Sequence, residues 1–173
     1  LVDGTNANAV ARLRRRKVRP FKPLAVMVSS LDAAESQGHL DAAARASLVR
    51  REGPIVIVPA RRNALAEGVH PDLDCVGLML PTTPLHQLLA ERCPPLVATS
   101  GNREGEPLAC DEADAQTRLA DVADCLLHHD RSIQRPVDDS VVRIMASRPV
   151  TFRAARGLAP LRLDLHQRSP LQI

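Results

Sequence analysis

Aromatic side chains are almost absent from this sequence of 173 residues: Phe21 and Phe152 are the only two, and there is no Trp or Tyr. The hydrophobic core must therefore be aliphatic, and a platform that stacks the bases of a nucleic acid strand on aromatic rings cannot be built. Apolar residues still make up 45% of the chain, which lies in the range of globular domains and allows one stable core.

Zinc-binding cysteine patterns and membrane-length apolar runs are missing too. The four cysteines form no CxxC motif and no Cys/His spacing, which argues against a structural zinc site and favours free thiols in a reducing compartment. The longest apolar runs have four to six residues, whereas a membrane helix needs about 20. Since no secretory segment is present either, we expect a soluble cytoplasmic protein without a membrane partner.

Short aliphatic runs bounded by proline and glycine alternate with helix-like segments. Because the runs do not alternate polar and apolar residues, they predict strands buried on both faces. We expect strands over residues 23–28, 54–59, 76–80, 95–100, 125–128, 141–145 and 150–153. Helices are expected over 6–16, 41–50, 84–92 and 111–119, and residues 33–46 read as alanine-rich helix. This order predicts an α/β open sheet.

A dense group of cations occupies the stretch RRRKVRPFK, residues 14–22. It allows a small-phosphate site, a polynucleotide surface or a solvated helix end. Pro20 and Pro23 stiffen the passage into the next strand, which a flexible basic tail would not need, so the small-phosphate site is favoured. We expect residues 12–16 to be helix-end charges that can be replaced at modest cost.

Three further stretches carry candidate polar groups. TSGN, residues 99–102, follows a buried strand and suits an oxyanion, although the same residues also form ordinary turns. Asp138 and Asp139 suit Mg²⁺ and Ser140 could donate to a phosphate, with plain loop residues as the alternative. The guanidinium groups of Arg153 and Arg156 suit a carboxylate, carbamate or phosphate, with a surface pair as the alternative.

Taken in order, these stretches resemble the YrdC-like domain of the HypF family of carbamoyltransferases. The resemblance rests on LVDGTNANAVARLRRRKVRPFKPLAVMV, VGLMLPTTPLHQLL, PLVATSGNREGEPL, LLHHDRSIQRPVDDSVVR and RAARGLAP. It covers residues 1–165, with 166–173 as the start of a linker, and it implies a twisted open mixed sheet flanked by helices. The family's KGxGG segment belongs just before Leu1, so we expect an N-terminally truncated fragment that is inactive by itself.

The resemblance also implies an activity. HypF-type proteins use carbamoyl phosphate and ATP to carbamoylate the C-terminal cysteine of the acceptor protein HypE, in the maturation of nickel-iron hydrogenase. Their YrdC-like domain forms carbamoyl-adenylate from ATP and carbamate and releases pyrophosphate. The expected cofactors are therefore ATP and Mg²⁺, and the expected partners are carbamoyl phosphate and a HypE-like protein.

Carried over position by position, the resemblance implies three groups of site residues. The catalytic group holds the ATP phosphates: Lys17, Arg19 and Lys22. The nucleotide-binding group comprises Thr99, Ser100 and Asn102, with Asp139 and Ser140 of the DSVV element. The substrate-binding group comprises His86, Arg153 and Arg156. Mg²⁺ is expected to arrive with ATP, with Asp139 as a candidate ligand, and no metal belongs to the protein itself.

Two alternative functions remain. The first is a threonylcarbamoyl-AMP synthase of the same superfamily, which acts in tRNA modification, although LMLPTTPLH is closer to HypF. The second is a module that binds RNA, including double-stranded RNA, through the basic stretch. The net charge is only +3 with 20 acidic residues, so any positive field is local and nucleic acid is the less favoured partner.

Overall fold

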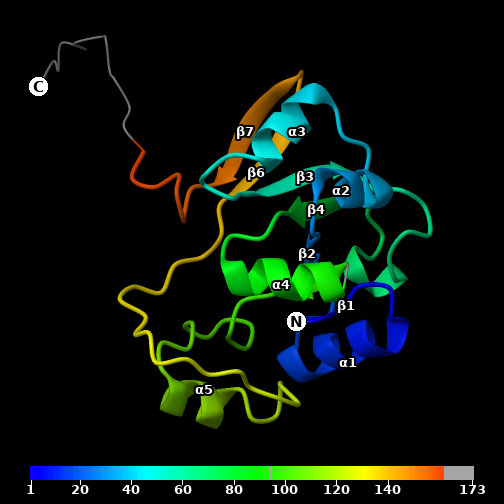
Figure 1. Ribbon diagram of the computed structural model, residues 1–173. Coiled ribbons are helices and arrows are strands. Elements are labelled where there is room, and N and C mark those ends of the chain that lie inside the picture. The colour runs from blue at the N-terminus through cyan, green and yellow to red at the C-terminus, as the bar shows by residue number, and fades with distance from the viewer. Residues whose placement is uncertain (94, 162–173) are drawn as a thin grey trace, which may run out of the picture.

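Seven strands form one mixed sheet in the computed structural model, which describes residues 1–93 and 95–161. The strand order is β1-β5-β2-β4-β3-β6-β7, with β2/β4 and β3/β6 parallel and the other neighbours antiparallel. The strands are β1 (Val2–Asp3), β2 (Ala25–Met27), β3 (Ile55–Pro59), β4 (Cys75–Met79), β5 (Leu96–Ala98), β6 (Val141–Met145) and β7 (Arg148–Arg153) (Figure 1). The predicted α/β open mixed sheet is confirmed.

Five α-helices and one short 3-10 helix accompany the sheet: α1 (Ala7–Lys17), α2 (Leu31–Gln37), α3 (Ala42–Leu48), η1 (Glu67–Val69), α4 (Pro84–Arg92) and α5 (Glu112–Arg118). Each α-helix follows a residue whose side chain accepts a hydrogen bond from the first turn: Asn6, Ser30, Asp41, Thr83 and Asp111. These capping groups satisfy backbone N–H donors that have no partner inside the helix, so the sequence fixes where each helix begins.

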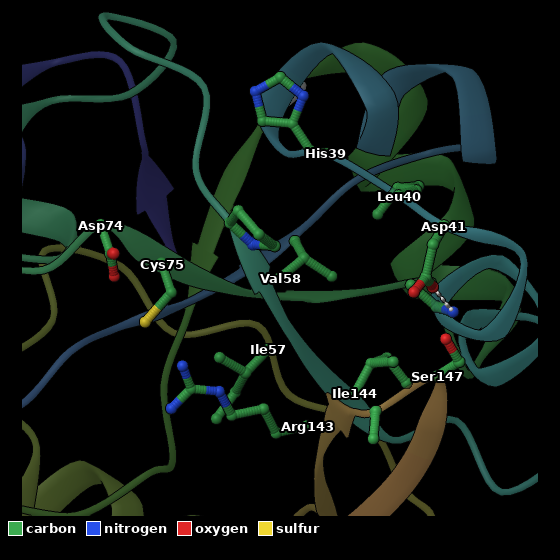
Figure 2. Close-up of a pocket in the computed structure, with 13 residues that line it drawn as sticks. His39, Leu40, Asp41, Ile57, Val58, Asp74, Cys75, Arg143, Ile144 and Ser147 are labelled. Carbon is green, nitrogen blue, oxygen red and sulfur yellow. Dashed lines mark hydrogen bonds between the residues drawn. The ribbon is translucent and has the colours of Figure 1, made fainter.

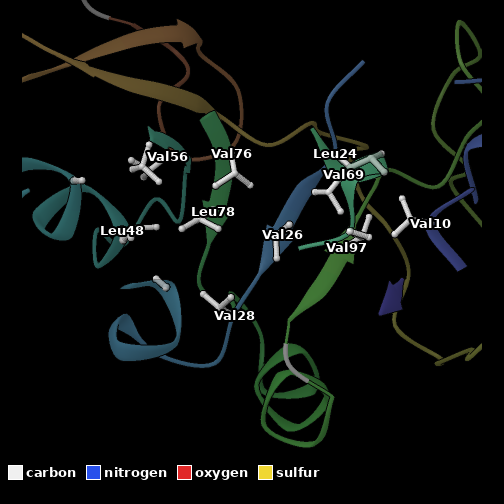
Figure 3. Close-up of a cluster of buried hydrophobic side chains, with 14 of the residues drawn as sticks. Val10, Leu24, Val26, Val28, Leu48, Val56, Val69, Val76, Leu78 and Val97 are labelled. Atoms are coloured by element: carbon white, nitrogen blue, oxygen red, sulfur yellow. The ribbon is translucent and has the colours of Figure 1, made fainter. Parts of the chain in front are cut away.

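The two faces of the sheet are covered to different extents. One face buries aliphatic side chains such as Val26, Val56 and Leu78 beneath α1, α2, α3 and η1 (Figure 3). On the other face α4 covers only one part, where Ala90 packs near Met27. Within residues 1–93 and 95–161 no other helix packs in this second cluster, and the rest of the face lines the candidate site.

Two strand predictions need correction. Residues 125–128 form no strand: three of the four are exposed, and Leu127 is 73% exposed. The residues just before this segment contact α1, where Arg16 donates to the Val122 carbonyl oxygen at 3.3 Å and pairs with Asp124 at 2.6 Å. Strand β7 was expected to be buried on both faces, yet all six of its residues are exposed, since it forms the edge of the sheet.

The alanine-rich region 33–46 contains two helices instead of one. Gly38 ends α2 and forms a bridge with Ala60, and a Cβ atom at this position would lie 2.6 Å from a methyl carbon of Val58. The close approach of the two backbones therefore interrupts the helix. The short strand β1 was not predicted either.

The described residues also bear on the remaining expectations. They include no helix long and apolar enough to cross a bilayer. The four cysteines are free thiols. The expected linker, residues 166–173, and the end of the expected domain, residues 162–165, lie outside the described part of the chain.

Candidate functional site

A cavity of about 620 Å³, called here the main cavity, opens on the sheet face that α4 leaves uncovered. Its floor includes Ala98, Ala25 and Gly77, which are neighbours across β5, β2 and β4. The next strands in the same row contribute the larger Ile57 and Arg143. Because Ala98 and Ala25 have one side-chain carbon each, a ligand can approach the backbone of the sheet there, whereas a methyl carbon of Ile55 covers Gly77.

The three cations assigned to the ATP phosphates all line this cavity. Lys17, at the end of α1, is only 2% exposed, and its Nζ donates to the Ser100 carbonyl oxygen at 2.5 Å. Burial, and secondarily the charge of Arg19, lowers the pKa of Lys17 to about 8, against an opposing effect of Glu104. The contact brings together two motifs that lie 83 positions apart in the sequence.

Arg19 and Lys22 lie on the loop between α1 and β2. The Nζ of Lys22 pairs with Glu104 at 2.5 Å, and this contact lowers the pKa of the Glu104 carboxyl. Arg19 donates through Nη2 to the Pro23 carbonyl at 2.9 Å, but its buried Nε has no acceptor among residues 1–93 and 95–161. An oxygen atom of a bound anion would satisfy that donor.

Arg14 corrects the expectation that residues 12–16 are replaceable helix-end charges. Its side chain is 9% exposed, and the guanidinium donates to the carbonyls of Arg19, Pro20 and Lys22 at 2.8, 3.1 and 3.0 Å. It also donates to Gly68 at 2.5 Å. Since the prolines of this loop have no N–H with which to build a turn, one buried guanidinium fixes the loop that carries Arg19 and Lys22.

The TSGN turn closes the same end of the cavity. Its polar residues Thr99, Ser100 and Asn102 all line the cavity. The Ser100 hydroxyl donates to Asn102 Oδ1 at 2.5 Å, and Asn102 Nδ2 donates to the Glu106 carbonyl at 2.7 Å. Gly105, which follows in the lining, has a φ of +84°, a backbone conformation that favours glycine.

Asp139 connects the main cavity to a second polar group. Arg156 donates to Asp139 Oδ1 at 2.6 and 3.2 Å and to the Gly53 carbonyl at 3.2 Å. Ser140 is fully buried: its hydroxyl donates to the Arg156 carbonyl at 2.9 Å and accepts from the Ala155 N–H at 2.9 Å. The structure thus places Ser140 beside the cavity as a support for the Arg156 segment, not in its lining.

His86 belongs to this second group and not to the cavity lining. Its Nδ1 lies 3.3 Å from the Thr82 hydroxyl. Burial, and then the charge of Arg156, lowers the pKa of His86, while Asp139 acts in the opposite direction. The neutral imidazole is therefore favoured here.

Arg153 lines the cavity on β7. It donates from Nε to the Asp139 carbonyl at 2.8 Å and pairs with Asp138 at 3.2 Å. The carboxylates of Asp138 and Asp139 are thus both engaged by arginines, and no cluster of three or more His, Cys, Asp or Glu in the described residues could hold a metal ion.

A second cavity of about 550 Å³ adjoins the first and was not predicted from the sequence (Figure 2). Ile57, Cys75 and Arg143 line both cavities, so the two spaces meet over β3, β4 and β6. The second cavity extends toward His39 and the β6–β7 turn at Ser147. The sequence also gave no reason to single out the small floor residues or Phe152, which lines the main cavity.

The chain is similar in sequence and in structure to known proteins. The Sua5/YciO/YrdC family model, described as telomere recombination, matches residues 1–155. Carbamoyltransferase HypF of Synechocystis sp. is 44% identical over 165 residues, which are 94% of this chain and 22% of that protein. A crystal structure of full-length HypF in the phosphate- and nucleotide-bound form has a TM-score of 0.88 and 39% identity, over 92% of this chain and 25% of that one.

A more distant structure shares only the fold. P. abyssi Sua5 complexed with L-threonine has a TM-score of 0.77 at 21% identity, over 89% of this chain and 46% of that one. The chain therefore spans about a quarter of the HypF proteins and about half of that Sua5 chain. The chain belongs to the Sua5/YciO/YrdC family, in the branch formed by the HypF proteins.

Proposed function

We propose that the chain forms carbamoyl-adenylate from ATP and carbamate, as the nucleotide-activating part of a HypF-type carbamoyltransferase. The observation that carries this proposal is the contact of Lys17 with Ser100, which unites the basic stretch and the TSGN turn at one end of the main cavity. Carbamate would derive from carbamoyl phosphate, and the carbamoyl group would pass to a HypE-like acceptor protein. We propose residues 1–165 as the domain responsible.

In the proposed reaction a carbamate oxygen attacks the α-phosphorus of ATP. A phosphorus–oxygen bond forms, the bond to pyrophosphate breaks, and pyrophosphate leaves with the electron pair and its negative charge. Lys17, Arg19 and Lys22 would stabilise that charge, so the chain contributes position and electrostatics and needs no side-chain nucleophile. Arg153, which lines the cavity, would orient the carbamate, and Asp139 would link this site to Arg156 and His86, which lie outside the lining.

Mg²⁺ would neutralise phosphate charge when it arrives with ATP. Asp139 offers only Oδ2 for it, because Oδ1 accepts two hydrogen bonds from Arg156. We therefore assign Asp139 first to positioning Arg156, with Oδ2 as the candidate ligand for Mg²⁺.

Exchange of pyrophosphate tests the reaction. In a protein that joins this chain to the remaining segments of its HypF relatives, labelled pyrophosphate should enter ATP only when carbamoyl phosphate is present, because the label can enter only by attack on the acyl-adenylate. L-Threonine with bicarbonate serves as the control substrate and should support no exchange. Exchange with that pair alone would overturn the proposal in favour of threonylcarbamoyl-adenylate formation.

The floor of the main cavity offers a second test. Ala25→Leu should place its side chain over Gly77 and Ala98 and weaken ATP binding at least about tenfold, or roughly 1.4 kcal/mol, by filling the space. The matched variant Ala25→Ser keeps the floor open and should bind ATP as the wild type does. Calorimetric titration measures both affinities, and urea unfolding checks that Ala25→Leu remains folded. Equal affinities in the two variants would exclude this floor as the binding surface.

Binding of RNA receives less support from the same residues. Arg14 and Lys17 are buried, so neither presents its charge on an outer surface. Arg12 and Arg16 both pair with Asp124, at 3.1 and 2.6 Å. The basic stretch is thus largely turned inward or neutralised, whereas a polynucleotide requires cations spread over an open face.

A further inference from the structure

Phe152 and Arg153 are consecutive residues of β7, yet both line the main cavity. In a regular strand successive side chains point to opposite faces of the sheet. The pairing with β6 explains the exception: Thr151 lies opposite Val142 and Arg153 lies opposite Val141, so Phe152 is the extra residue of a β-bulge. Counted from Thr151 on the core face, Phe152 alternates onto the cavity face, and the bulge places Arg153 on that same face.

The β6 residues opposite Thr151 and Arg153 show which face of the sheet each side chain occupies. Val142 is buried in the core on the covered face, whereas Val141 lines the cavity. Without the bulge, Phe152 would stand opposite Val141 and still face the cavity, whereas Arg153 would point away from it. Bulges are common beside active sites because they re-aim one side chain without changing the rest of the strand.

The ring of Phe152 is available to a ligand. Phe152 is 56% exposed, and it is one of the two aromatic residues in the sequence. Ile55 and Val141 add aliphatic surface to the same cavity. Among the described residues, no other Phe, Tyr or Trp ring lines either cavity, so a flat apolar contact can be made at one place only.

The main cavity thus has Lys17, Arg19 and Lys22 at one end and the aromatic ring of Phe152 at the other, where it stands beside Arg143 and Arg153. Lys17 and Ser100 lie beside β5 and β2, while Phe152 lies on β7 at the opposite edge of the sheet. A nucleotide has the same polarity, with an anionic phosphate chain at one end and a planar base at the other. One ring suffices for one base, although two rings in the whole chain cannot serve a strand of bases.

We propose that Phe152 is the stacking platform for the adenine base of ATP. The inference rests on the proposed function, because it takes the phosphates to lie at Lys17. Stacking uses the face of the base and not its hydrogen-bonding edge, so Phe152 sets the preference for a nucleotide over a base-free polyphosphate.

Measuring the binding of both ATP and inorganic tripolyphosphate to the chain tests the phosphate site and the stacking role of Phe152 separately. Phe152→Ala should weaken ATP binding about 5- to 100-fold, the range that loss of one base–aromatic contact gives, and leave the affinity for tripolyphosphate unchanged. Phe152→Leu keeps an apolar side chain but has no flat ring, so its affinity for ATP should fall by a similar factor. Phe21→Ala, which removes the other ring outside the cavity lining, is the matched control and should change neither affinity.

A fluorescence measurement keeps the test independent of affinity. Because the chain has no tryptophan, Phe152→Trp introduces a single reporter. Its emission should be quenched by saturating ATP and unaffected by tripolyphosphate, whereas Phe21→Trp should respond to neither. If the wild type binds ATP and Phe152→Ala binds it equally tightly, only the stacking role is overturned. Failure of the wild type to bind both ligands overturns the proposed function and the stacking role with it.

Discussion

Replacing Lys17 with methionine is expected to weaken ATP binding by about 100-fold, because removal of one charge from a desolvated ion pair costs about 2–5 kcal/mol. The side chain is 2% exposed, so water cannot replace the lost ammonium group. Its position next to the Ser100 carbonyl fixes where the charge stands before any ligand arrives. Calorimetric titration at pH 7 measures the loss.

The titration of Lys17 should also make ATP binding depend on pH. In the free chain its pKa is lowered to about 8, so the amine is mostly charged at pH 7 and loses its proton as the pH rises through 8. A bound triphosphate stabilises the ammonium form and raises this pKa, so binding above pH 8 must take up a proton. The affinity for ATP should then fall by up to about tenfold per pH unit above 8. Terminal phosphates titrate near pH 6 and do not contribute there.

Two variants isolate this effect. Lys17→Arg keeps the positive charge but does not titrate in this range, so its affinity should stay level between pH 8 and 9.5. Lys17→Met removes the titrating group and should show no alkaline decline. An alkaline decline of equal slope in Lys17→Met would show that another group is responsible.

The buried face of α1 could have been recognised from the sequence. Val10, Leu13, Arg14 and Lys17 follow the spacing i, i+3, i+4, i+7, which marks one face of a helix. The prediction for residues 12–16 failed at Arg14 because it treated a run of like charges as one surface. In a helix, neighbouring residues point in different directions, so Arg14 is buried while Arg15 is exposed.

Other features depend on pairings that no local pattern contains. The bulge at Phe152 exists only relative to Val141 and Val142 on β6. The floor of the main cavity likewise arises because Ala25 pairs with Gly77 on one side and Ala98 on the other, although each looks ordinary in its own strand. Order and type of most elements could thus be predicted from periodicity and caps, whereas the shape of the cavity required the sheet register.

Segments far apart in the chain meet at the candidate site, and their contacts make them interdependent. Arg19 and Lys22 lie on the loop after α1, and the TSGN turn accepts a hydrogen bond from Lys17. Asp139 accepts hydrogen bonds from Arg156. The contacts of Lys17 and Arg14 end on backbone carbonyls, which fix position more firmly than mobile side chains do. Loss of a buried donor should therefore disturb the loop that it holds as well as its own charge.

Arg14→Met should show this most clearly. The variant leaves the carbonyls of Arg19, Pro20 and Lys22 without their buried donor, and we expect a loss of about 3 kcal/mol in the free energy of unfolding. For a chain of this size that loss lowers Tm by roughly 6–12 °C. ATP binding should weaken too, because the loop that presents Arg19 and Lys22 is no longer fixed. Urea unfolding and calorimetric titration measure the two effects.

The neighbouring arginine provides the control for that prediction. Arg15→Met makes the same change of charge and volume one position along the same helix, but its side chain is exposed, so stability should change by less than about 0.5 kcal/mol. Arg14→Lys should not restore the wild type, because one ammonium group cannot reach acceptors spread from Gly68 to Lys22. Equal stability of Arg14→Met and Arg15→Met would mean that the loop holds its conformation through its prolines alone.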